Sequence, residues 1–399
     1  MANEGTIFAG RDPAGNERDF FHVNRTKQIH NGRYYGLKII FTGGGTAGHV
    51  MPNIALIQRL KDEGWDIAYI GSRNGMEKDL ITAIPGIRYF GISSGKLRRY
   101  LSLQNLSDPV RVQHGYHQAL SIMRKERPDV VFSKGGYVSL PVVAAAKNSR
   151  LVPGSKKIRV ISHESDYTPG LANRLAKPYC DTICVTFEDT VPMIKNSHVI
   201  YTGTPIRPEL KKGDRERGLT FTGLSGKRPV LLVMGGSSGA QHMNELVRDT
   251  LDLLLKTFDV VHLCGKGKVD ESCKKEGYIQ YEYISEELPD LFAISDMVIS
   301  RAGANAVFEL LDLKLPSVLI PLPLSASRGD QILNAKYFEK KGMAKMVDQD
   351  NTSPEDLHKA VMDVYADRES YIRAMEADEA GNGTESVLKV IRDAVKQQN

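Results

Sequence analysis

The sequence predicts an α/β fold built from two doubly wound, Rossmann-like domains that face each other across a cleft. Short β-branched runs alternate with helical segments along most of the chain, as they do in βαβ units with parallel strands. Two of these runs, at residues 37–41 and 230–234, lead directly into glycine-rich turns that precede helices. In open sheets of this kind the ligand lies outside the carboxyl ends of the strands, so we expect the site at these turns.

The boundaries of the two domains follow from where the strand-like runs begin and end. The first series comprises residues 37–41, 67–70, 130–132, 158–161 and 182–185, and it ends in a turn at 201–205. The second series comprises residues 230–234, 260–263, 297–300 and 317–321. We therefore expect a polar, poorly ordered leader at residues 1–36, one domain at 37–203 and a second at 204–399.

The C-terminal part of the chain begins with a strong helix start. Ser353 supplies an N-cap hydroxyl, Pro354 takes the first helical position, and Glu355 and Asp356 place acids in the first turn. We expect the terminal helix to pack back across the junction of the two domains.

Composition excludes several classes of protein. The chain has 399 residues with 41% apolar and 25% charged side chains, which are globular values and exclude wholesale disorder. A single Trp and 7% aromatic residues argue against an aromatic platform for single-stranded nucleic acid, so no nucleic-acid partner is expected. The net charge of +5 permits an acidic partner, such as anionic lipid or a pyrophosphate, without requiring one.

The cysteines and the apolar runs bear on the compartment. The four cysteines form no CxxC pair, which favours a reduced, cytosolic chain without a metal centre. The first 36 residues lack the apolar core of a signal peptide. The longest uncharged stretch, residues 39–58, is interrupted by glycines and by Pro52, so we expect no transmembrane helix.

The stretch GGGTAG at residues 43–48 fits the pattern GxGxxG after a strand. Glycines let backbone N–H groups approach an anion, and the following helix adds the positive end of its dipole. A nicotinamide site would also have an acid at the end of the second strand, where this chain has Gly71, Ser72 and Arg73. Phosphate or sugar binding is therefore favoured over an NADP site or a merely tight turn.

Three ionisable residues follow strands of the first domain, and each has a structural alternative. His49 comes directly after the glycine loop, where it suits a catalytic role better than a purely structural one. Glu164 and Asp166 follow the strand near residues 158–161 and suit a site, although a solvated loop is the alternative.

A second glycine turn follows the strand at residues 130–132. Gly135, Gly136 and Tyr137 suit a phosphorylated ligand there, with an ordinary β-to-α turn as the alternative.

The second half carries the corresponding donor-side features. Gly235, Gly236 and Ser237, and likewise residues 301–305, place small residues before a helix, which suits a phosphate. Glu309, one turn into the second of these helices, suits two vicinal hydroxyls, with a plain helix-surface acid as the alternative. Residues 348–350 (DQD) resemble a metal-binding DxD motif but lie in a polar stretch before a helix cap, so no metal is expected.

Residues 96–103 mix Lys96, Arg98 and Arg99 with leucines and a tyrosine. A basic and apolar surface of this kind suits an anionic membrane interface. An amphipathic element that packs on the core has the same pattern.

Seven motifs in order along the chain carry a resemblance to a known family: GGGTAGHVMPNIAL, SKGGYVSLPVVAAAK, HESDYTPGLANRLA, GTPIRPEL, VMGGSSGAQHMNEL, SRAGANAVFELL and RGDQILNA. From about residue 37 to its end the chain resembles the MurG family of bacterial transferases. These add N-acetylglucosamine, as the second sugar, to the undecaprenyl-pyrophosphoryl-muramyl-pentapeptide precursor of peptidoglycan. The resemblance implies a two-domain GT-B fold, inversion at the anomeric carbon, and no required metal or other cofactor.

The resemblance also implies roles for residues in the first domain. Thr46, Ala47 and Gly48 correspond to positions beside the donor sugar and phosphates, and His49 lies in the catalytic cleft. The first domain takes the lipid acceptor and the membrane surface.

In the second domain the resemblance implies the UDP-sugar contacts. Arg207 and Ser237 match contacts to the diphosphate and nucleotide, Ile284 meets the uracil through its backbone, and Gln331 meets the sugar hydroxyls. The positions that correspond to the phosphate and ribose contacts are Ala304, Asn305, Ala306, Val307, Phe308 and Glu309.

At three positions the chain departs from the commoner family pattern. Ala47 replaces a glycine of the first loop, Asp166 replaces an Asn that often contacts the sugar, and Asp330 replaces a second Gln. These departures leave the role of Asp166 open.

The resulting interpretation is a peripheral enzyme on the cytoplasmic face of the cell membrane. Its substrates are UDP-N-acetylglucosamine and the 4-hydroxyl of lipid-linked N-acetylmuramic acid, in cell-wall synthesis and therefore in cell shape and division. The alternatives are a diacylglycerol glycosyltransferase, a UDP-sugar epimerase of the same architecture, and a donor-binding subunit without catalysis.

Overall fold

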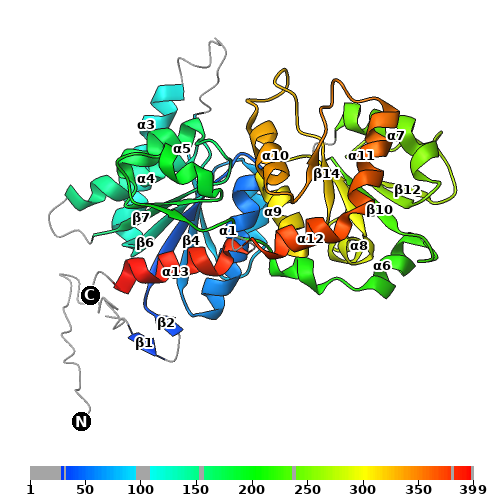
Figure 1. The fold of residues 1–399 in the computed structure, drawn as a ribbon. Helices are drawn as coiled ribbons and strands as arrows, with labels where there is room; N and C mark the ends of the chain where they lie inside the picture. Colours follow the sequence, from blue (N-terminus) through cyan, green and yellow to red (C-terminus); the bar gives the residue numbers. More distant parts are fainter. Residues whose placement is uncertain are drawn as a thin grey trace, which may run out of the picture.

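Two parallel sheets, one in each half of the chain, form the framework of the protein (Figure 1). The computed structural model describes residues 28–30, 33–95, 108–151, 157–235, 240–378 and 382–396. Within these residues, the two doubly wound domains predicted from the sequence are confirmed, and residues from both domains meet at their junction.

The first sheet has seven parallel strands. In order across the sheet they are β5 (Arg88–Ile92), β4 (Asp66–Ser72), β3 (Lys38–Thr42), β6 (Val130–Ser133), β7 (Arg159–Glu164), β8 (Thr182–Val185) and β9 (Val199–Tyr201). The order reverses between β3 and β6, and such a switch point opens a crevice for a ligand.

Among the described residues of this half of the chain, the α-helices are α1 (Ala47–Asp62), α2 (Met76–Thr82), α3 (Asp108–Glu126), α4 (Ser139–Asn148) and α5 (Leu171–Ala176). Alternation along the strands explains how both faces of the sheet are covered. Ile39 and Phe41 of β3 pack with α1 on one face, whereas Ile40 packs with α3 and α4 on the other. Because both faces are buried, the strands read as nearly continuous apolar runs, which made them visible in the sequence.

The second sheet has six parallel strands with the same kind of reversal, between β10 and β13. Their order is β12 (Tyr278–Tyr281), β11 (Asp259–Leu263), β10 (Val230–Met234), β13 (Met297–Ser300), β14 (Ser317–Leu319) and β15 (Lys345–Met346). The helices of this half are α6 (Arg215–Thr222), α7 (Gln241–Leu254), α8 (Leu288–Ile294), α9 (Ala304–Leu313), α10 (Asp330–Lys340), α11 (Pro354–Ala366) and α12 (Arg368–Glu376). The predicted start of α11 is confirmed, because Ser353 and Asp356 form a capping box.

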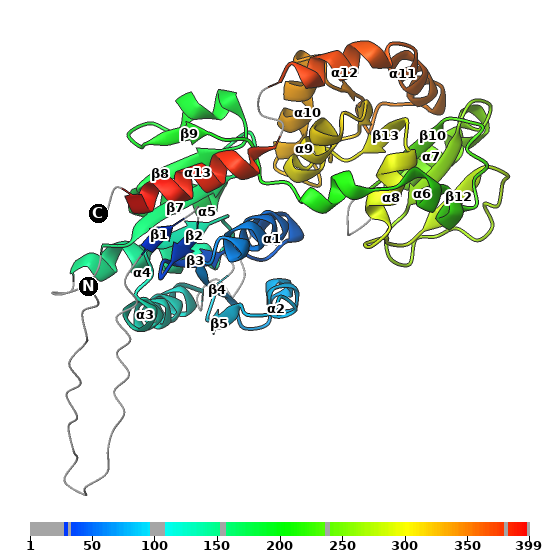
Figure 2. The same ribbon diagram turned by 90° about the horizontal axis from the view of Figure 1, so that it is seen from below.

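The last helix, α13 (Gly383–Lys396), lies across the first domain (Figure 2). Val387, Leu388 and Ile391 are buried in the same cluster as Ile39 and Phe41 of the first sheet. The chain therefore crosses the junction twice, once after β9 and once between α12 and α13.

The two crossings touch each other at a position that only glycine fits. A Cβ on Gly383 would lie 2.5 Å from the carbonyl carbon of Gly203 and 2.6 Å from Thr204 N. The amide of Gly383 donates to Thr204 O at 3.1 Å, which fixes the second crossing against the first.

An aromatic cluster joins the two domains. Phe187, which follows β8, packs with ring-centroid distances of 5.2 Å to Phe308 and 5.0 Å to Tyr337 of the second domain. Phe187 is fully buried within the second domain's core cluster. Edge-to-face aromatic packing of this kind adds about 0.5–1.5 kcal/mol per pair beyond the burial of area.

Part of the expected leader is ordered. Strands β1 (Gln28–His30) and β2 (Arg33–Tyr35) form an antiparallel pair. Tyr34 is buried against Trp65, with ring centroids 5.4 Å apart, and its amide donates to Glu63 O. At least one residue of the expected polar stretch, Tyr34, therefore packs on the core. Residues 1–27 lie outside the described residues.

Candidate functional site

Two glycine loops meet at the switch point of the first sheet. One follows β3 at residues 43–45 and the other follows β6 at residues 134–136. Gly136 has φ +86°, and a Cβ there would lie 2.4 Å from Gly44 O. The two loops are thus in backbone contact, which a side chain at Gly136 would prevent.

A buried acid that the sequence analysis missed holds the first loop. Glu77 is fully buried, and Gly45 N donates to its Oε2 at 3.4 Å. Ser72 donates to Oε1 from its amide at 2.9 Å and from its hydroxyl at 2.5 Å. The sequence search for an acid at the end of the second strand stopped at Arg73, whereas the acid that faces this loop comes from α2.

His49 lies in the first turn of α1, beside this loop. Its Nδ1 lies 3.0 Å from Thr46 Oγ1 and 3.1 Å from Gly44 O. Burial, followed by the positive charge of Lys134, lowers the pKa of His49 from 6.5 to about 4. The imidazole is therefore neutral at pH 7 and has a free ring nitrogen for a proton.

Glu164 holds the loop that follows β7. Its Oε1 accepts from Asp166 N at 3.1 Å, and its Oε2 accepts from Gly170 N at 2.9 Å and from Asn173 Nδ2 at 2.8 Å. Burial, followed by the charge of Asp166, raises the pKa of Glu164. Both oxygens of Glu164 therefore hold the loop, and the catalytic role expected from the sequence stays a prediction.

Asp166 faces the second domain. Its carboxylate lies 3.6 Å from Arg328 Nη2 and accepts from Asn334 Nδ2 at 3.5 Å. Burial, followed by the charge of Asp330, raises the pKa of Asp166. Arg328 also lies 2.6 Å from Asp330, so one guanidinium group lies between acids from the two domains.

Further hydrogen bonds cross the cleft beside this ion pair. Tyr167 N donates to Asn334 Oδ1 at 3.1 Å, and Thr168 Oγ1 donates to Asp330 Oδ1 at 3.2 Å. The segment after β7, in the first domain, is therefore hydrogen-bonded to α10, in the second domain.

In the second domain, Glu309 and Arg207 form a pair at the start of α9. Arg207 Nη2 donates to Glu309 Oε1 at 3.1 Å. Burial raises the pKa of Glu309, and the charge of Arg207 opposes that shift. The Nε of Arg207 is buried and has no hydrogen-bond partner among the described residues.

The other side chains in the first turns of α9 fall into two groups: one contacts the first domain, and the other is buried in the core. Asn305 Nδ2 donates to Gly48 O at 3.0 Å across the cleft. Ala304, Val307 and Phe308 are buried in the core, so only their backbone can reach a ligand. Ala306 is half-buried. The N-terminus of α9 therefore offers amides, which favour an anion.

The remaining candidates lie around this cleft or outside the described residues. Ile284 is buried, and Gln331 Oε1 accepts from Leu322 N at 3.0 Å. Tyr137 is exposed beside Gly135, which has φ +98°. Ser237 lies outside the described residues, as do residues 96–103, so the structure places neither.

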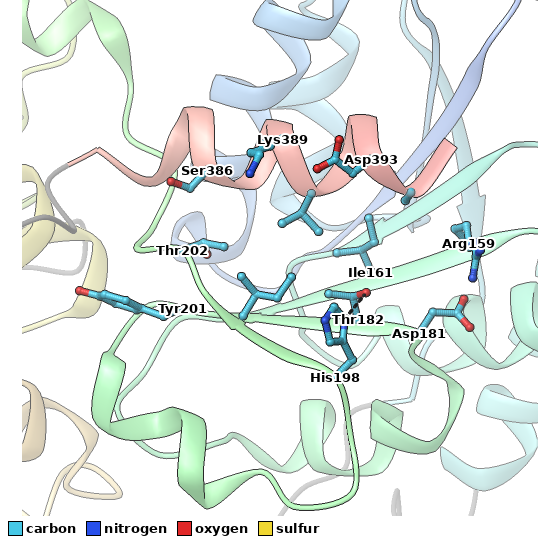
Figure 3. Close-up of a pocket in the computed structure, with 13 residues that line it drawn as sticks. Arg159, Ile161, Asp181, Thr182, His198, Tyr201, Thr202, Ser386, Lys389 and Asp393 are labelled. Atoms are coloured by element: carbon cyan, nitrogen blue, oxygen red, sulfur yellow. Dashed lines mark hydrogen bonds between the residues drawn. The ribbon is translucent and has the colours of Figure 1, made fainter. Parts of the chain in front are cut away.

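A cavity of about 570 Å³ lies away from the cleft, between α13 and strands β7 to β9 (Figure 3). Charged side chains of Arg159, Asp181, Lys389 and Asp393 line it together with apolar ones. None of the candidate site residues lines this cavity.

The described residues contain neither a cluster of metal-binding side chains nor a membrane-spanning helix. They contain no group of three or more His, Cys, Asp or Glu side chains arranged to hold a metal ion. No helix among them is long and apolar enough to cross a membrane.

Comparison with protein-family models gives two matches that together span most of the chain. Residues 39–185 match the N-terminal domain of glycosyltransferase family 28, and residues 230–391 match its C-terminal domain.

Two curated relatives are similar over nearly their whole length. A protein of Clostridium perfringens strain SM101 is 52% identical over 356 residues, which is 89% of this chain and 98% of the relative. A protein of Lachnospira eligens is 52% identical over 360 residues, 90% of this chain and 99% of the relative. Both are named UDP-N-acetylglucosamine–N-acetylmuramyl-(pentapeptide) pyrophosphoryl-undecaprenol N-acetylglucosamine transferase.

Solved structures show the same architecture. The crystal structure of Acinetobacter baumannii MurG superposes with a TM-score of 0.69 at 25% identity, covering 90% of this chain and 99% of that one. A putative UDP-N-acetylglucosamine 2-epimerase from Listeria monocytogenes has a TM-score of 0.63 at 13% identity, covering 91% of this chain and 98% of that one, a likeness of fold alone.

Proposed function

The chain belongs to glycosyltransferase family 28, and we propose that it transfers N-acetylglucosamine from UDP-N-acetylglucosamine to the 4-hydroxyl of undecaprenyl-pyrophosphoryl-N-acetylmuramyl-pentapeptide. The observation that carries this proposal is the contact between the two domains at Asn305 and Gly48, together with the relatives that match the chain over nearly its full length. A neutral His49 follows Gly48 in one domain, and the Glu309–Arg207 pair lies one turn after Asn305 in the other. Relatives at 52% identity carry the name of this transferase.

On the donor side, the UDP group is held by charge and by helix amides. The guanidinium of Arg207 and the amides at the start of α9 take the diphosphate, whose charge increases as UDP leaves. Glu309 takes the vicinal hydroxyls of the ribose. Ser237, Ile284 and Gln331 complete the contacts to the nucleotide and sugar.

On the acceptor side, His49 accepts the proton of the attacking 4-hydroxyl. A base in this role contributes about 10²–10⁴-fold to the rate, so positioning and charge stabilisation supply the remainder. Gly135, Gly136 and Tyr137 hold the acceptor pyrophosphate, whereas Thr46, Ala47 and Gly48 lie beside the donor sugar and phosphates. Attack from the first domain on a sugar held by the second reaches the face opposite to UDP, which inverts the anomeric carbon.

The acceptor carries a lipid, so we also place the enzyme at the cytoplasmic face of the cell membrane as a peripheral protein. Lys96, Arg98 and Arg99 are the basic residues proposed to meet the anionic surface. A pocket of about 330 Å³ lies at the carboxyl ends of β4 and β5. Two of its lining residues, Ser93 and Ser94, come shortly before this basic segment in the sequence. Arg73 and Arg111 both line it and give it positive charge.

The alternative functions are not favoured. A UDP-sugar epimerase shares the two-domain architecture, but the epimerase likeness is one of fold alone, at 13% identity. A diacylglycerol glycosyltransferase would share the donor side, but the curated relatives at 52% identity are named for a muramyl-linked acceptor.

A panel of acceptors tests the proposal. The protein is incubated with UDP-N-acetylglucosamine radiolabelled in the sugar and with a short-chain lipid-linked N-acetylmuramyl-pentapeptide, with diacylglycerol, or without acceptor. We expect label only in the muramyl-linked acceptor. Label in diacylglycerol, or an epimerised sugar without acceptor, would replace the proposal with the corresponding alternative.

A further inference from the structure

Lys134 is a fully buried lysine at the carboxyl end of β6, between the two glycine loops. Lysine is almost never fully buried unless it is paired, because its ammonium group loses its hydration. No step of the transfer described above uses this side chain. Its burial at the edge of the sheet that faces the cleft therefore calls for a function.

The ammonium group of Lys134 is held by two side chains. Nζ donates to His163 Nδ1 at 2.7 Å and to Thr204 Oγ1 at 3.3 Å. His163 is itself fully buried, and its Nε2 lies 2.9 Å from Gly203 O. Since a carbonyl oxygen only accepts, His163 carries its proton on Nε2 and donates it to Gly203, which leaves Nδ1 free to accept from Lys134.

These contacts connect the cleft to the linker between the domains. Gly203 and Thr204 form the first crossing of the chain, and Gly383 of the second crossing donates to Thr204 O at 3.1 Å. The stem of Lys134 is close to the first glycine loop, because a Cβ on Gly43 would lie 3.3 Å from Lys134 Cβ. One side chain thus contacts the loop before His49, the end of β7 and the linker.

We propose that Lys134 is a positioning residue for the transfer reaction, whose ammonium group fixes the linker at Gly203 and Thr204 to the sheet edge that carries His49. This proposal rests on the proposed function. The orientation of the second domain, and with it the donor, is then set relative to the base through the contacts of Lys134 with Thr204 and His163.

Titratable groups on β7, β8 and α1 face Lys134. Glu164 at the end of β7, Asp166 after it and Cys184 on β8 raise the pKa of Lys134, but burial outweighs them and lowers the value to about 7. Lys134 in turn lowers the pKa values of His49 on α1 and of His163 on β7. A charged Lys134 therefore also keeps the proposed base in its neutral form.

A purely structural lysine predicts a different outcome from a positioning one. Removing Lys134 leaves His163 Nδ1 and Thr204 Oγ1 without their donor, and an unsatisfied buried acceptor costs about 1–3 kcal/mol of stability. Met has a similar unbranched stem and lacks both the charge and the donors. In the Lys134→Met variant, a loss of rate in protein that urea unfolding shows to be folded therefore indicates positioning rather than structural support.

The test compares three variants of the full chain with the parent. Lys134→Met removes the charge and both hydrogen bonds, whereas Thr204→Val removes one acceptor and leaves the charge. Lys147→Met is the matched control: Lys147 lies on α4 outside the cleft, and its partner Asp181 keeps Arg150. The measurements are hydrogen exchange of the linker amides, urea unfolding, calorimetric UDP binding, kcat with both KM values, and NMR titration of His49.

For Lys134→Met we expect faster exchange at residues 203–206 and 382–384, unchanged UDP affinity, and kcat lower by about 10- to 100-fold with little change in either KM. The pKa of His49 rises, because a nearby positive charge has been removed. Thr204→Val accelerates linker exchange without moving His49, and Lys147→Met resembles the parent.

Two results would overturn the proposal. Unchanged hydrogen exchange of the linker amides in Lys134→Met would show that Lys134 does not hold the linker, whatever the activity of the variant. Parent-like kcat in a folded Lys134→Met protein would show that the fixed linker does not matter for transfer. If the parent itself transfers no sugar, the proposed function fails, and the exchange data still decide whether Lys134 holds the linker.

Discussion

Replacing Glu309 with Gln tests the donor side of the cleft. The substitution keeps the size of the side chain and removes its charge. In the structure, Oε1 of Glu309 accepts from Arg207, which leaves Oε2 to accept from a ligand hydroxyl. The amide of Gln has one acceptor oxygen in place of two, so it cannot serve Arg207 and two vicinal hydroxyls together.

The size of the effect follows from the hydrogen bond that is lost. A hydrogen bond to a charged, buried group contributes about 1.5–3 kcal/mol, and each 1.4 kcal/mol is tenfold in affinity. We therefore expect Glu309→Gln to raise the KM for UDP-N-acetylglucosamine by about 10- to 100-fold. The calorimetric affinity for UDP alone should weaken by a similar factor, and kcat should change little because His49 is intact.

The same helix offers a matched control. Asp312 lies three residues beyond Glu309 on α9 and pairs with Lys211 at 2.8 Å instead of with Arg207. Asp312→Asn is the same acid-to-amide change and should leave the UDP affinity as in the parent. If Glu309→Gln also leaves it unchanged, Glu309 is not part of the donor site and the reasoning is refuted.

Three further predictions concern the membrane surface, the cleft and the core. Replacing Lys96, Arg98 and Arg99 together by Ser should weaken binding to anionic vesicles about a hundredfold, at about 1 kcal/mol per residue, with UDP binding retained; equal co-sedimentation with the parent would place the interface elsewhere. Asp166→Asn should lower kcat less than tenfold, because Asp166 contacts Arg328 and Asn334 across the cleft, and a hundredfold loss would make it catalytic. His262 is buried with its pKa lowered from 6.5 to about 3, so the unfolded chain binds more protons below pH 6.5. The free energy of unfolding should therefore fall by about 2 kcal/mol from this residue between pH 7 and pH 5, and an equally steep fall in His262→Gln in urea titrations would contradict that assignment.

The fold could be predicted where burial dictates the sequence. The central strands β3, β6, β10 and β13 are buried on both faces and consist almost wholly of apolar residues, so they were identified from the sequence. Strand β5 was missed, because it lies at an edge of its sheet and begins with Arg88, whose charge pairs with Asp66 at 2.6 Å. An edge strand of this kind carries charged side chains whose ion-pair partners are known only from the folded structure.

The same distinction holds for the site. The glycine loops and Glu309 were found because each lies next to a strand or a helix start in the sequence. Glu77 and Lys134 were not found, because their functions depend on distant partners: Glu77 meets a loop 32 residues away, and Lys134 meets Thr204, 70 residues away. Arg328 likewise acquires its place only when the two domains meet at Asp166.

In the proposed reaction His49, held neutral in the first domain, is the base for transfer from a donor held in the second. The pH dependence of kcat in the parent and in His49→Ala tests it most directly, with donor and acceptor saturating. The parent should keep a constant rate from about pH 6, where Lys134 with its pKa of about 7 is charged, to about pH 5, and lose it below because the pKa of His49 is about 4. His49→Ala should lower kcat by about 10²–10⁴-fold, abolish this acid limb and leave the donor KM unchanged. A variant with parent-like kcat and a raised donor KM would contradict the account, because His49 would then bind the substrate without taking its proton.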